Sequence, residues 1–486
     1  MKLNIKYIVL VLLIALTGTS CQKFLDVKPR TEMPQDVLFS TESGFKDALT
    51  GVYIQLKSDA GYGKALTMTT LEQLISSWDV TANSTEQRLG LYNFADAGVQ
   101  QSLANVFGQQ YKVIASINAI LGHIDAKKSV FKPGMYEMIK GECLALRAYC
   151  HFDVLRLFGP VPTATSIGNQ LPYVTVLSNT PNAPVSFETF KTAMLKDLAE
   201  AEALQRDVDP FTKYSMDDFK LPSQVAVFKP EDDFISYRYL RMNYYAVKAL
   251  QARAYLWFND KAKAYESAKF LIDVKNINGT QKFRLGNSSD MTNKDYVLTA
   301  EHIFGLYDFD LYTKYGNTFG NGTLKKGTAE ATIKNQLYGN SGTDIREANL
   351  WELITLSNNA KCYVLKKYQV EQNPSRLAAD FKQIPMLRIS EMYMIAIESA
   401  PLGEAQNLWA AYRNSRNISV TTLPADPVQL QMELLKEYRK EFYAEGQAFY
   451  AYKRVNALKG SVLFTPSNAT VNYLLPLPKT ESSTAN

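Results

Sequence analysis

Histidine and cysteine are scarce in this sequence, which has three histidines and four cysteines among 486 residues. The histidines, His123, His151 and His302, are too far apart for the HExxH spacing of a helical zinc site. His151 follows the apolar face of a predicted helix, where a packed core histidine is the simpler explanation. We therefore expect no catalytic metal and no cofactor.

The cysteines do not form a disulfide framework. Cys143 and Cys150 are seven positions apart on one predicted helix. At about 1.5 Å per residue their backbones are separated by about 10 Å, which exceeds the ~7 Å limit for a disulfide. Both are expected to pack as small apolar side chains.

Neither sign of charge dominates, since Lys and Arg number 53 and Asp and Glu number 48. So small an excess does not favour nucleic acid as a partner. The glycine-rich stretch 316–327 is followed by Thr328, where a phosphate-binding loop requires a lysine. The adjacent acids at 217–218 and 232–233 do not specify two carboxyl groups facing each other across a cleft, as glycoside hydrolysis needs. The sequence therefore predicts no enzyme.

Long apolar runs are also missing, except for Tyr7–Leu16, which follows two lysines and precedes four small residues and Cys21. Ten residues are about half of the ~20 that span a bilayer, so residues 1–20 are interpreted as a cleaved secretory signal. A cysteine at the cleavage point resembles the lipobox of bacterial lipoproteins. The resemblance implies lipid attachment at Cys21 and a chain anchored to a membrane. Gly18 stands where lipoboxes prefer leucine, and a secreted protein with a chance cysteine is the alternative.

Helical periodicity dominates the rest of the chain. Tyr136–Phe158, in a stretch that begins at Met135, repeats apolar residues at three- and four-residue spacing and ends at a Gly-Pro pair. Paired helical segments are predicted at 238–258 with 261–274 and at 385–399 with 403–416, and Asp426 is expected to cap a helix that runs to about residue 445. The predicted fold is mainly α, with tetratricopeptide-like helical hairpins forming a superhelical scaffold.

Long irregular loops and a few short strands are expected between these helices. The loops are predicted at 159–184, 207–233 and 307–342, and the strands at 302–307 and 363–368. No linker divides the mature chain. Residues 21–486 are therefore predicted to form one composite unit, with an N-terminal part of about 21–235 and a C-terminal part of about 236–486.

Six stretches resemble the SusD/RagB family of nutrient-binding lipoproteins and occur in that family's order. They are Cys21–Asp26, Phe39–Leu56, Gly141–Pro162, Pro385–Glu398, Glu437–Gly446 and Tyr473–Pro478. Two positions depart from the family pattern: Tyr438 replaces the first arginine of Glu-Arg-Arg, and Ala448 stands where arginine is common. The resemblance implies a non-catalytic protein on the outer face of the outer membrane, with a SusC-like TonB-dependent transporter as partner.

Two stretches combine aromatic side chains with hydrogen-bonding groups, as sugar recognition requires. They are Trp78–Tyr92 and Tyr307–Phe319. The candidate ligand-binding residues are Trp78, Asp79, Asn83, Arg88, Tyr92, Tyr312 and Tyr315. The alternative for each aromatic residue is burial in the core.

Three functions remain open. The preferred one is capture of an oligosaccharide, or of another oligomeric nutrient such as a peptide, and its delivery to the transporter. The second is a surface glycoside hydrolase, which the missing catalytic motif disfavours. The third is a helical-repeat scaffold that assembles other surface proteins.

Overall fold

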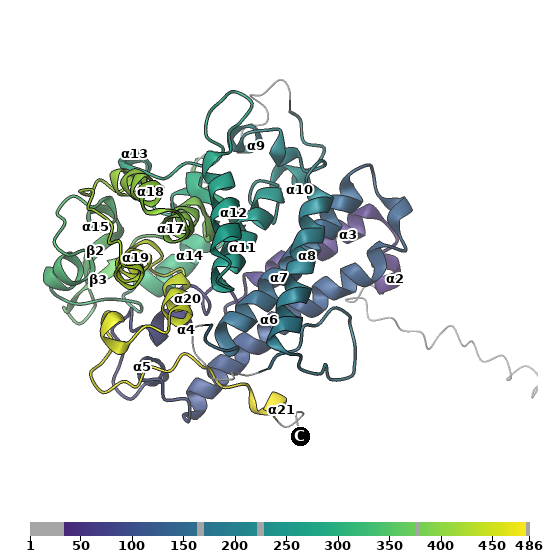
Figure 1. Cartoon of the computed structure of the whole chain (residues 1–486). Helices are drawn as coiled ribbons and strands as arrows, with labels where there is room; N and C mark the ends of the chain where they lie inside the picture. The colour runs from purple at the N-terminus through teal and green to yellow at the C-terminus, as the bar shows by residue number, and fades with distance from the viewer. Residues whose placement is uncertain (1–33, 163–169, 221–227, 376–379, 483–486) are drawn as a thin grey trace, which may run out of the picture.

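The computed structural model describes residues 34–162, 170–220, 228–375 and 380–482 (Figure 1). The predicted signal peptide and Cys21 lie outside these residues. Within the described ranges, no helix combines the length and apolar character that a membrane crossing requires.

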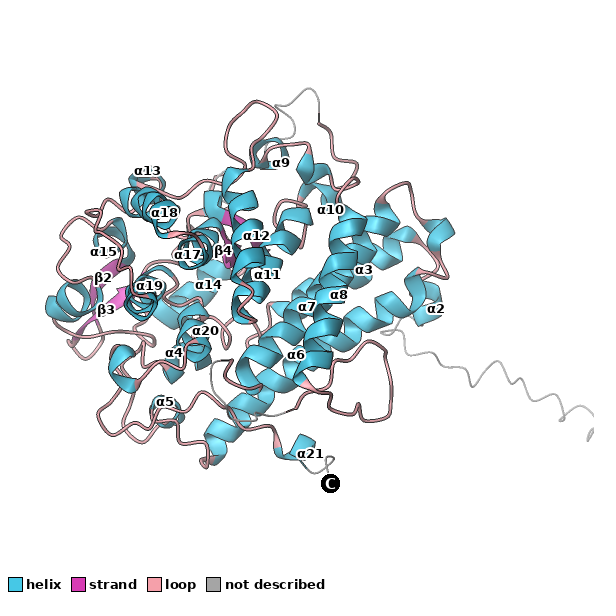
Figure 2. Ribbon diagram, viewed as in Figure 1, coloured by secondary structure: helices cyan, strands magenta, loops and turns pink. Residues whose placement is uncertain are grey.

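Helices make up most of the fold, and strands are few and short (Figure 2). The principal helices are α3 (Glu42–Leu56), α6 (Ala97–Ile124), α7 (Met135–Phe158), α8 (Phe187–Gln205), α11 (Tyr244–Trp257), α12 (Lys261–Asp273), α17 (Ile389–Ser399), α18 (Leu402–Ser415), α19 (Pro427–Glu441) and α20 (Gln447–Arg454). The short helices are α2 (Gln35–Leu38), α4 (Thr70–Leu74), α5 (Thr85–Gly90), α9 (Met216–Lys220), α10 (Asp233–Ser236), α13 (Ser288–Thr292), α14 (Leu311–Tyr315), α15 (Ile345–Leu350) and α21 (Lys479–Ser482).

The principal helices form one continuous stack. Along the series α3, α6, α7, α8, α11, α12, α17 and α18, each helix packs against the next (Figure 1). Neighbours in the series are mostly neighbours in sequence, which is the packing of helical hairpins. The predicted mainly α, tetratricopeptide-like fold is confirmed.

Helix α7 is buried along most of its length, and its bounds agree with the prediction to within one residue. It packs against α6 and α8 (Figure 1), and Leu146 and Leu155 are 0% and 2% exposed. His151 is buried: its Nδ1 lies 2.9 Å from the Arg147 carbonyl oxygen, and its Nε2 accepts a hydrogen bond from the Val174 N–H. Burial lowers the pKa of His151 to about 3, so the ring is neutral at pH 7.

The capping side chains set several helix boundaries. Asp426 accepts a hydrogen bond from the Gln429 N–H, as predicted. The helix predicted from residue 238 begins only at Tyr244, because the Asn243 side chain caps it by accepting from the Ala246 N–H. Arg238 lies before this helix in the core, where it pairs with Asp209.

The strands form two small antiparallel pairs. Strand β1 (His302–Tyr307) pairs with β4 (Gln383–Arg388), and β2 (Trp351–Thr355) pairs with β3 (Lys361–Leu365). The strand predicted over 302–307 is confirmed. The helix predicted from residue 385 was wrong over its first turn, because these residues bond to β1 and the helix begins at Ile389.

Candidate functional site

The two stretches predicted to bind ligand lie against each other, although more than 200 positions separate them in sequence. The Trp78 and Phe319 ring centroids are 5.6 Å apart. The Asp79 N–H donates to the Lys325 carbonyl oxygen at 2.9 Å, and its carboxylate lies 3.2 Å from the Lys326 ammonium. These contacts join the segment before α5 to the loop after α14.

Three of the four aromatic residues proposed as platforms are in the core. Trp78 is 2% exposed, and its indole Nε1–H donates to the Met68 carbonyl oxygen at 2.7 Å. Its ring makes edge contacts with Phe319 and Tyr443. Tyr92 and Tyr315 are also buried. A stacking platform needs an open face, so the expectation of exposed rings at these three positions is corrected: dense aromatic packing covers them.

The other candidate residues remain nearer the surface. Asn83 is exposed, Asp79 has a 44% exposed side chain, and Arg88 is partly exposed with an ion pair to Asp96 at 3.5 Å. Tyr312 on α14 is 42% exposed. Polar groups are therefore available in both stretches, but Tyr312 is the open aromatic ring among the proposed residues.

A cavity of about 350 Å³ offers an aromatic surface that the sequence did not indicate. Its volume is at the lower end of the range for small-molecule sites. It lies between the turn after α13, the segment that follows β3 and the residues just before β4. Its lining residues are Asn293, Lys294, Tyr296, Gln369, Val370, Glu371 and Phe381.

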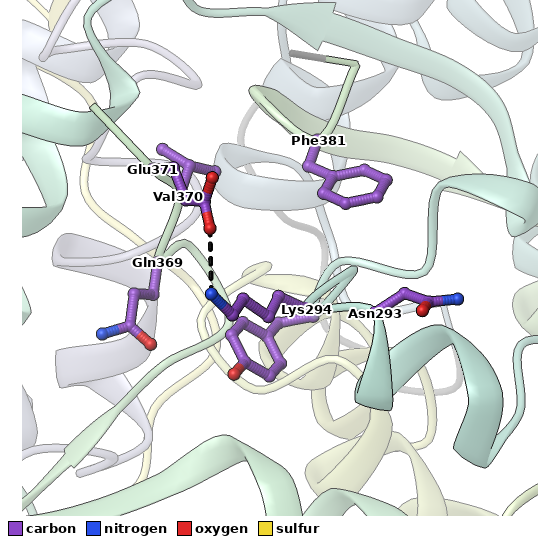
Figure 3. A pocket seen from close by; sticks show the side chains of 7 residues that line it. Asn293, Lys294, Gln369, Val370, Glu371 and Phe381 are labelled. Carbon is purple, nitrogen blue, oxygen red and sulfur yellow. Dashed lines mark hydrogen bonds and ion pairs between the residues drawn. The ribbon is translucent and has the colours of Figure 1, made fainter. Parts of the chain in front are cut away.

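The close view shows Lys294 reaching Glu371, with Phe381 beyond this ion pair and Gln369 and Asn293 on opposite sides of the cavity (Figure 3). The ammonium and carboxylate are 2.9 Å apart, and their side chains are 64% and 52% exposed. Such an exposed pair is worth at most about 1 kcal/mol, so a ligand can separate it at little cost.

The Asp295 side chain stabilises the turn after α13 through hydrogen bonds to Thr299. This buried carboxylate accepts hydrogen bonds from the Thr299 N–H at 2.9 Å and the Thr299 hydroxyl at 2.8 Å. Lys294 and Leu298 have positive φ angles of 65° and 58°, so the chain turns sharply on either side of Tyr296. Burial raises the pKa of Asp295 to about 7.

The cavity lies close to Tyr307–Phe319, the predicted ligand-binding stretch that follows β1. The Asp308 N–H donates to the Lys382 carbonyl oxygen at 2.8 Å. The Lys382 ammonium lies 4.9 Å from the Phe309 ring centroid, and Phe309 is 72% exposed. On the other side, the Lys366 ammonium lies 5.0 Å from the Tyr296 ring centroid. Exposed aromatic side chains and hydrogen-bonding groups therefore continue from the cavity towards α14.

This combination suits a ligand with apolar C–H faces and several hydroxyl groups. Tyr296 and Phe381 supply partly exposed rings, and the amides of Asn293 and Gln369 supply both donors and acceptors. Among the described residues, no group of three or more His, Cys, Asp or Glu side chains is placed to hold a metal ion.

Sequence reasoning missed this cavity because its members come from three separate segments. Asn293–Tyr296 is a polar and aromatic turn, which is a weak signal that many surface loops share. Gln369 and Phe381 lie more than 70 residues further on. The pairing of β1 with β4 and the position of β3 bring these segments together.

Solved structures share this fold over nearly the whole chain. A SusD homolog from Bacteroides thetaiotaomicron matches with a TM-score of 0.68 and 17% identity, covering 93% of this chain and 97% of its own. Surface glycan-binding protein A from the same organism, solved with laminarihexaose, matches with a TM-score of 0.63 and 15% identity, covering 92% and 98%. The chain therefore shares the fold of these two proteins.

Sequence comparison points to the same group of proteins as the structural comparison. Residues 23–208 match a SusD-like family model described as starch-binding and associating with the outer membrane. SusD-like protein P2 of Formosa agariphila is 22% identical over 98% of this chain and 97% of its own length. SusD-like protein P25 of that organism is 26% identical over 34% of this chain, and the match spans about a third of P25. The chain is therefore similar to SusD-like proteins, through the family model over residues 23–208 and through P2 over nearly its whole length.

Proposed function

We propose that this protein captures an oligosaccharide on the cell surface without cleaving it and delivers it to a partner TonB-dependent transporter of the outer membrane. The observation that supports capture most directly is the cavity between α13 and β4, where Tyr296 and Phe381 lie beside two amides and an ion pair. Family relatives support the ligand class, because one SusD-like structure is a laminarin-binding protein and another holds laminarihexaose.

Binding follows from the side chains that line the cavity. A pyranose ring stacks its C–H face on Tyr296 or Phe381. Its hydroxyl groups exchange hydrogen bonds with Asn293 and Gln369 and separate Lys294 from Glu371, whose side chains are both well exposed. Tyr312, Asp79, Asn83 and Arg88 are proposed to contact further sugar units beyond the cavity.

Delivery depends on the lipid anchor and on the partner. Acylation at Cys21 would hold the protein at the outer membrane, facing the cell exterior, beside a SusC-like transporter. The leader sequence and the family support both proposals. The absence of a recognisable pair of catalytic carboxylates in the sequence favours capture over hydrolysis.

A glycan panel tests capture against the other functions. Neutral hexasaccharides, including laminarihexaose, and a set of short peptides are titrated by calorimetry, and the solutions are then analysed for cleavage products. Retention of an intact saccharide supports the proposal. Cleavage would instead indicate a glycoside hydrolase, and binding of peptides alone would replace the saccharide by a peptide ligand.

Substitutions locate the site. Tyr296→Ala and Phe381→Ala are each expected to weaken saccharide binding about 10-fold or more, which corresponds to ~1.4 kcal/mol. Tyr265→Ala is the matched control, because this partly exposed tyrosine lies on α12, away from the cavity lining. Unchanged affinity in both cavity variants would contradict the proposed site.

A further inference from the structure

A second cavity lies on α6, in the part of the molecule opposite to α13. Its volume is about 340 Å³, nearly the same as that of the first cavity. It is bounded by α6, by residues 172–182 and by the C-terminal helix α21. Its lining residues are Phe107, Gly108, Tyr111, Pro172, Val174, Pro181, Asn182 and Glu481. Figure 1 shows α21 at the lower side and α13 at the upper left, and the two cavities share no lining residue.

Helix α6 supplies an aromatic wall in which Tyr111 is partly exposed and Phe107, 4% exposed, packs behind it. Phe107 and Tyr111 are four positions apart, so they lie on one face of the helix, and their ring centroids are 4.8 Å apart. Gly108 lies on the same stretch, and a Cβ atom built there meets no heavy atom within 4 Å. The glycine therefore leaves space beside the Tyr111 ring.

The opposite wall is fixed to the core. The Tyr111 hydroxyl donates to the Pro172 carbonyl oxygen at 3.0 Å, and the Asn118 amide donates to the Val174 carbonyl oxygen at 3.0 Å. An antiparallel bridge between Leu171 and Val185 closes the loop. This cavity is thus framed by hydrogen-bonded backbone, which keeps its shape before any ligand arrives.

The lining chemistry resembles that of the first cavity, with one difference in charge. The partly exposed Tyr111 ring and the proline rings offer surfaces for C–H faces, whereas Phe107 is buried behind them. Asn182 adds an amide that can donate and accept hydrogen bonds, and Glu481 adds a carboxylate. The lining residues that the structure describes include a carboxylate and no lysine or arginine. Lys294, in contrast, lines the first cavity. A neutral ligand therefore suits the second cavity better than an anionic one.

From this geometry we infer that the α6 cavity is a second saccharide-binding site, which takes one or two units of a neutral glycan. The inference rests on the proposed function of the first cavity. Two separate sites on one rigid scaffold allow a long glycan chain to be held at both. Its apparent affinity then exceeds that of a short oligosaccharide without any new contact at either site.

Gly108 permits a sharp test. Gly108→Leu places a branched side chain in the cavity from a helical position with open space, so the fold is retained. Gly122→Leu is the matched control, because Gly122 is an exposed glycine of the same helix with the same open space and does not line the cavity. Thermal unfolding of both variants verifies that they are folded.

The binding measurements use a panel of neutral hexasaccharides, the corresponding long polymers and an oligogalacturonate as the anionic probe. The doubly substituted Tyr296→Ala, Phe381→Ala protein isolates the second site. We expect it to retain binding of a neutral hexasaccharide, which Gly108→Leu then weakens at least 10-fold and Gly122→Leu leaves unchanged. For a long polymer, the wild type is expected to bind 10- to 100-fold more tightly than Gly108→Leu alone.

The outcomes separate the two proposals. If the wild type binds one hexasaccharide and Gly108→Leu has no effect, the second site is overturned and the first survives. If binding is lost only in Gly108→Leu, the first site is wrong and the second stands. If no panel member binds the protein with the first cavity disabled, or only the oligogalacturonate does, the inference of a neutral second site is overturned.

Discussion

At the scale of single residues, burial decides whether an aromatic side chain can contact a ligand. In the sequence Trp78 is followed by Asp79, Asn83 and Arg88, and this combination suggested an exposed ring that binds sugar. In the structure its indole is satisfied by a backbone carbonyl and covered by two aromatic neighbours. Tyr312, on α14, has the exposed ring that Trp78 lacks. Residue type predicted the chemistry, and packing decided which ring is open.

Replacing Trp78 with alanine is expected to destabilise the protein by about 3–5 kcal/mol, because a large buried ring and its hydrogen bond are lost. Denaturant unfolding measures this cost. Tyr312→Ala is the control and is expected to change stability by less than about 0.5 kcal/mol, since its ring is largely exposed. Similar stabilities for the two variants would show that Trp78 is not packed as described.

Asp295 makes the turn beneath the first cavity sensitive to pH. Its pKa is about 7 in the folded protein, against 3.8 as the ordinary value, because burial outweighs the hydrogen bonds from Thr299 and the attraction of Lys220. The nearby Asp290 carboxylate raises it further. Between about pH 4 and pH 7 the folded protein holds a proton that the unfolded chain has released. Stability from this group is therefore lost as the pH rises through 7.

Asp295→Asn should remove this dependence. Relative to the wild type, the variant is expected to gain stability between pH 4 and pH 8 by up to about 4 kcal/mol. Urea unfolding at the two pH values measures the difference. Asp310→Asn, at an exposed position, is the control and should show no comparable change. A pH-independent difference between Asp295→Asn and the wild type would contradict the shifted pKa.

At the scale of elements, a buried ionic cluster connects the C-terminal helices to the strands. The Glu441 carboxylate on α19 accepts hydrogen bonds from three arginines, Arg346, Arg388 and Arg416, at 2.8 to 3.0 Å. These arginines lie on α15, at the end of β4 and after α18. All four side chains are at most 3% exposed, so the carboxylate is held ionised with its pKa well below the ordinary range. The motif Glu437–Gly446 that carries part of the family resemblance thus contributes a structural junction.

Glu441→Gln is expected to cost about 3–5 kcal/mol, because it removes the anion shared by three buried guanidinium groups. Thermal or denaturant unfolding detects this loss. Glu433→Gln on the same helix is the matched control: Glu433 pairs with Lys436 at the surface, and its loss should cost less than about 1 kcal/mol. Equal effects of the two changes would show that the cluster does not join these elements energetically.

For the whole molecule, structural support and ligand binding fall to different parts of the chain. The series from α3 to α18 provides a rigid frame, and the irregular segments on it carry the two cavities. The family model covers residues 23–208 and therefore includes the α6 face of the second cavity. The division of the mature chain at about residue 235 stays a prediction.

The proposed lipid anchor would hold the whole chain through one atom, the Cys21 sulfur. Cys21→Ala is expected to leave the helical fold unchanged, measured by circular dichroism, and to release the protein from membranes, because buried acyl chains supply ~0.8 kcal/mol per CH₂. Fractionation after a high-salt wash measures the release. Cys362→Ala is the control, since this buried cysteine of β3 is not preceded by a leader. Membrane retention of the Cys21→Ala protein would contradict a lipid anchor.

The sequence alone determined the helical architecture and the resemblance to the SusD/RagB family. Local periodicity and capping residues placed α7 and the start of α19 correctly, because both depend on neighbours within one or two turns. Tertiary structure decided which aromatic rings are open and where the cavities lie. Tyr296 and Phe381, or Tyr111 and Pro172, meet only after distant segments pack, and no local pattern encodes that contact. Short-range forces fix helices, whereas the binding surfaces arise from how the completed helices and strands fit together.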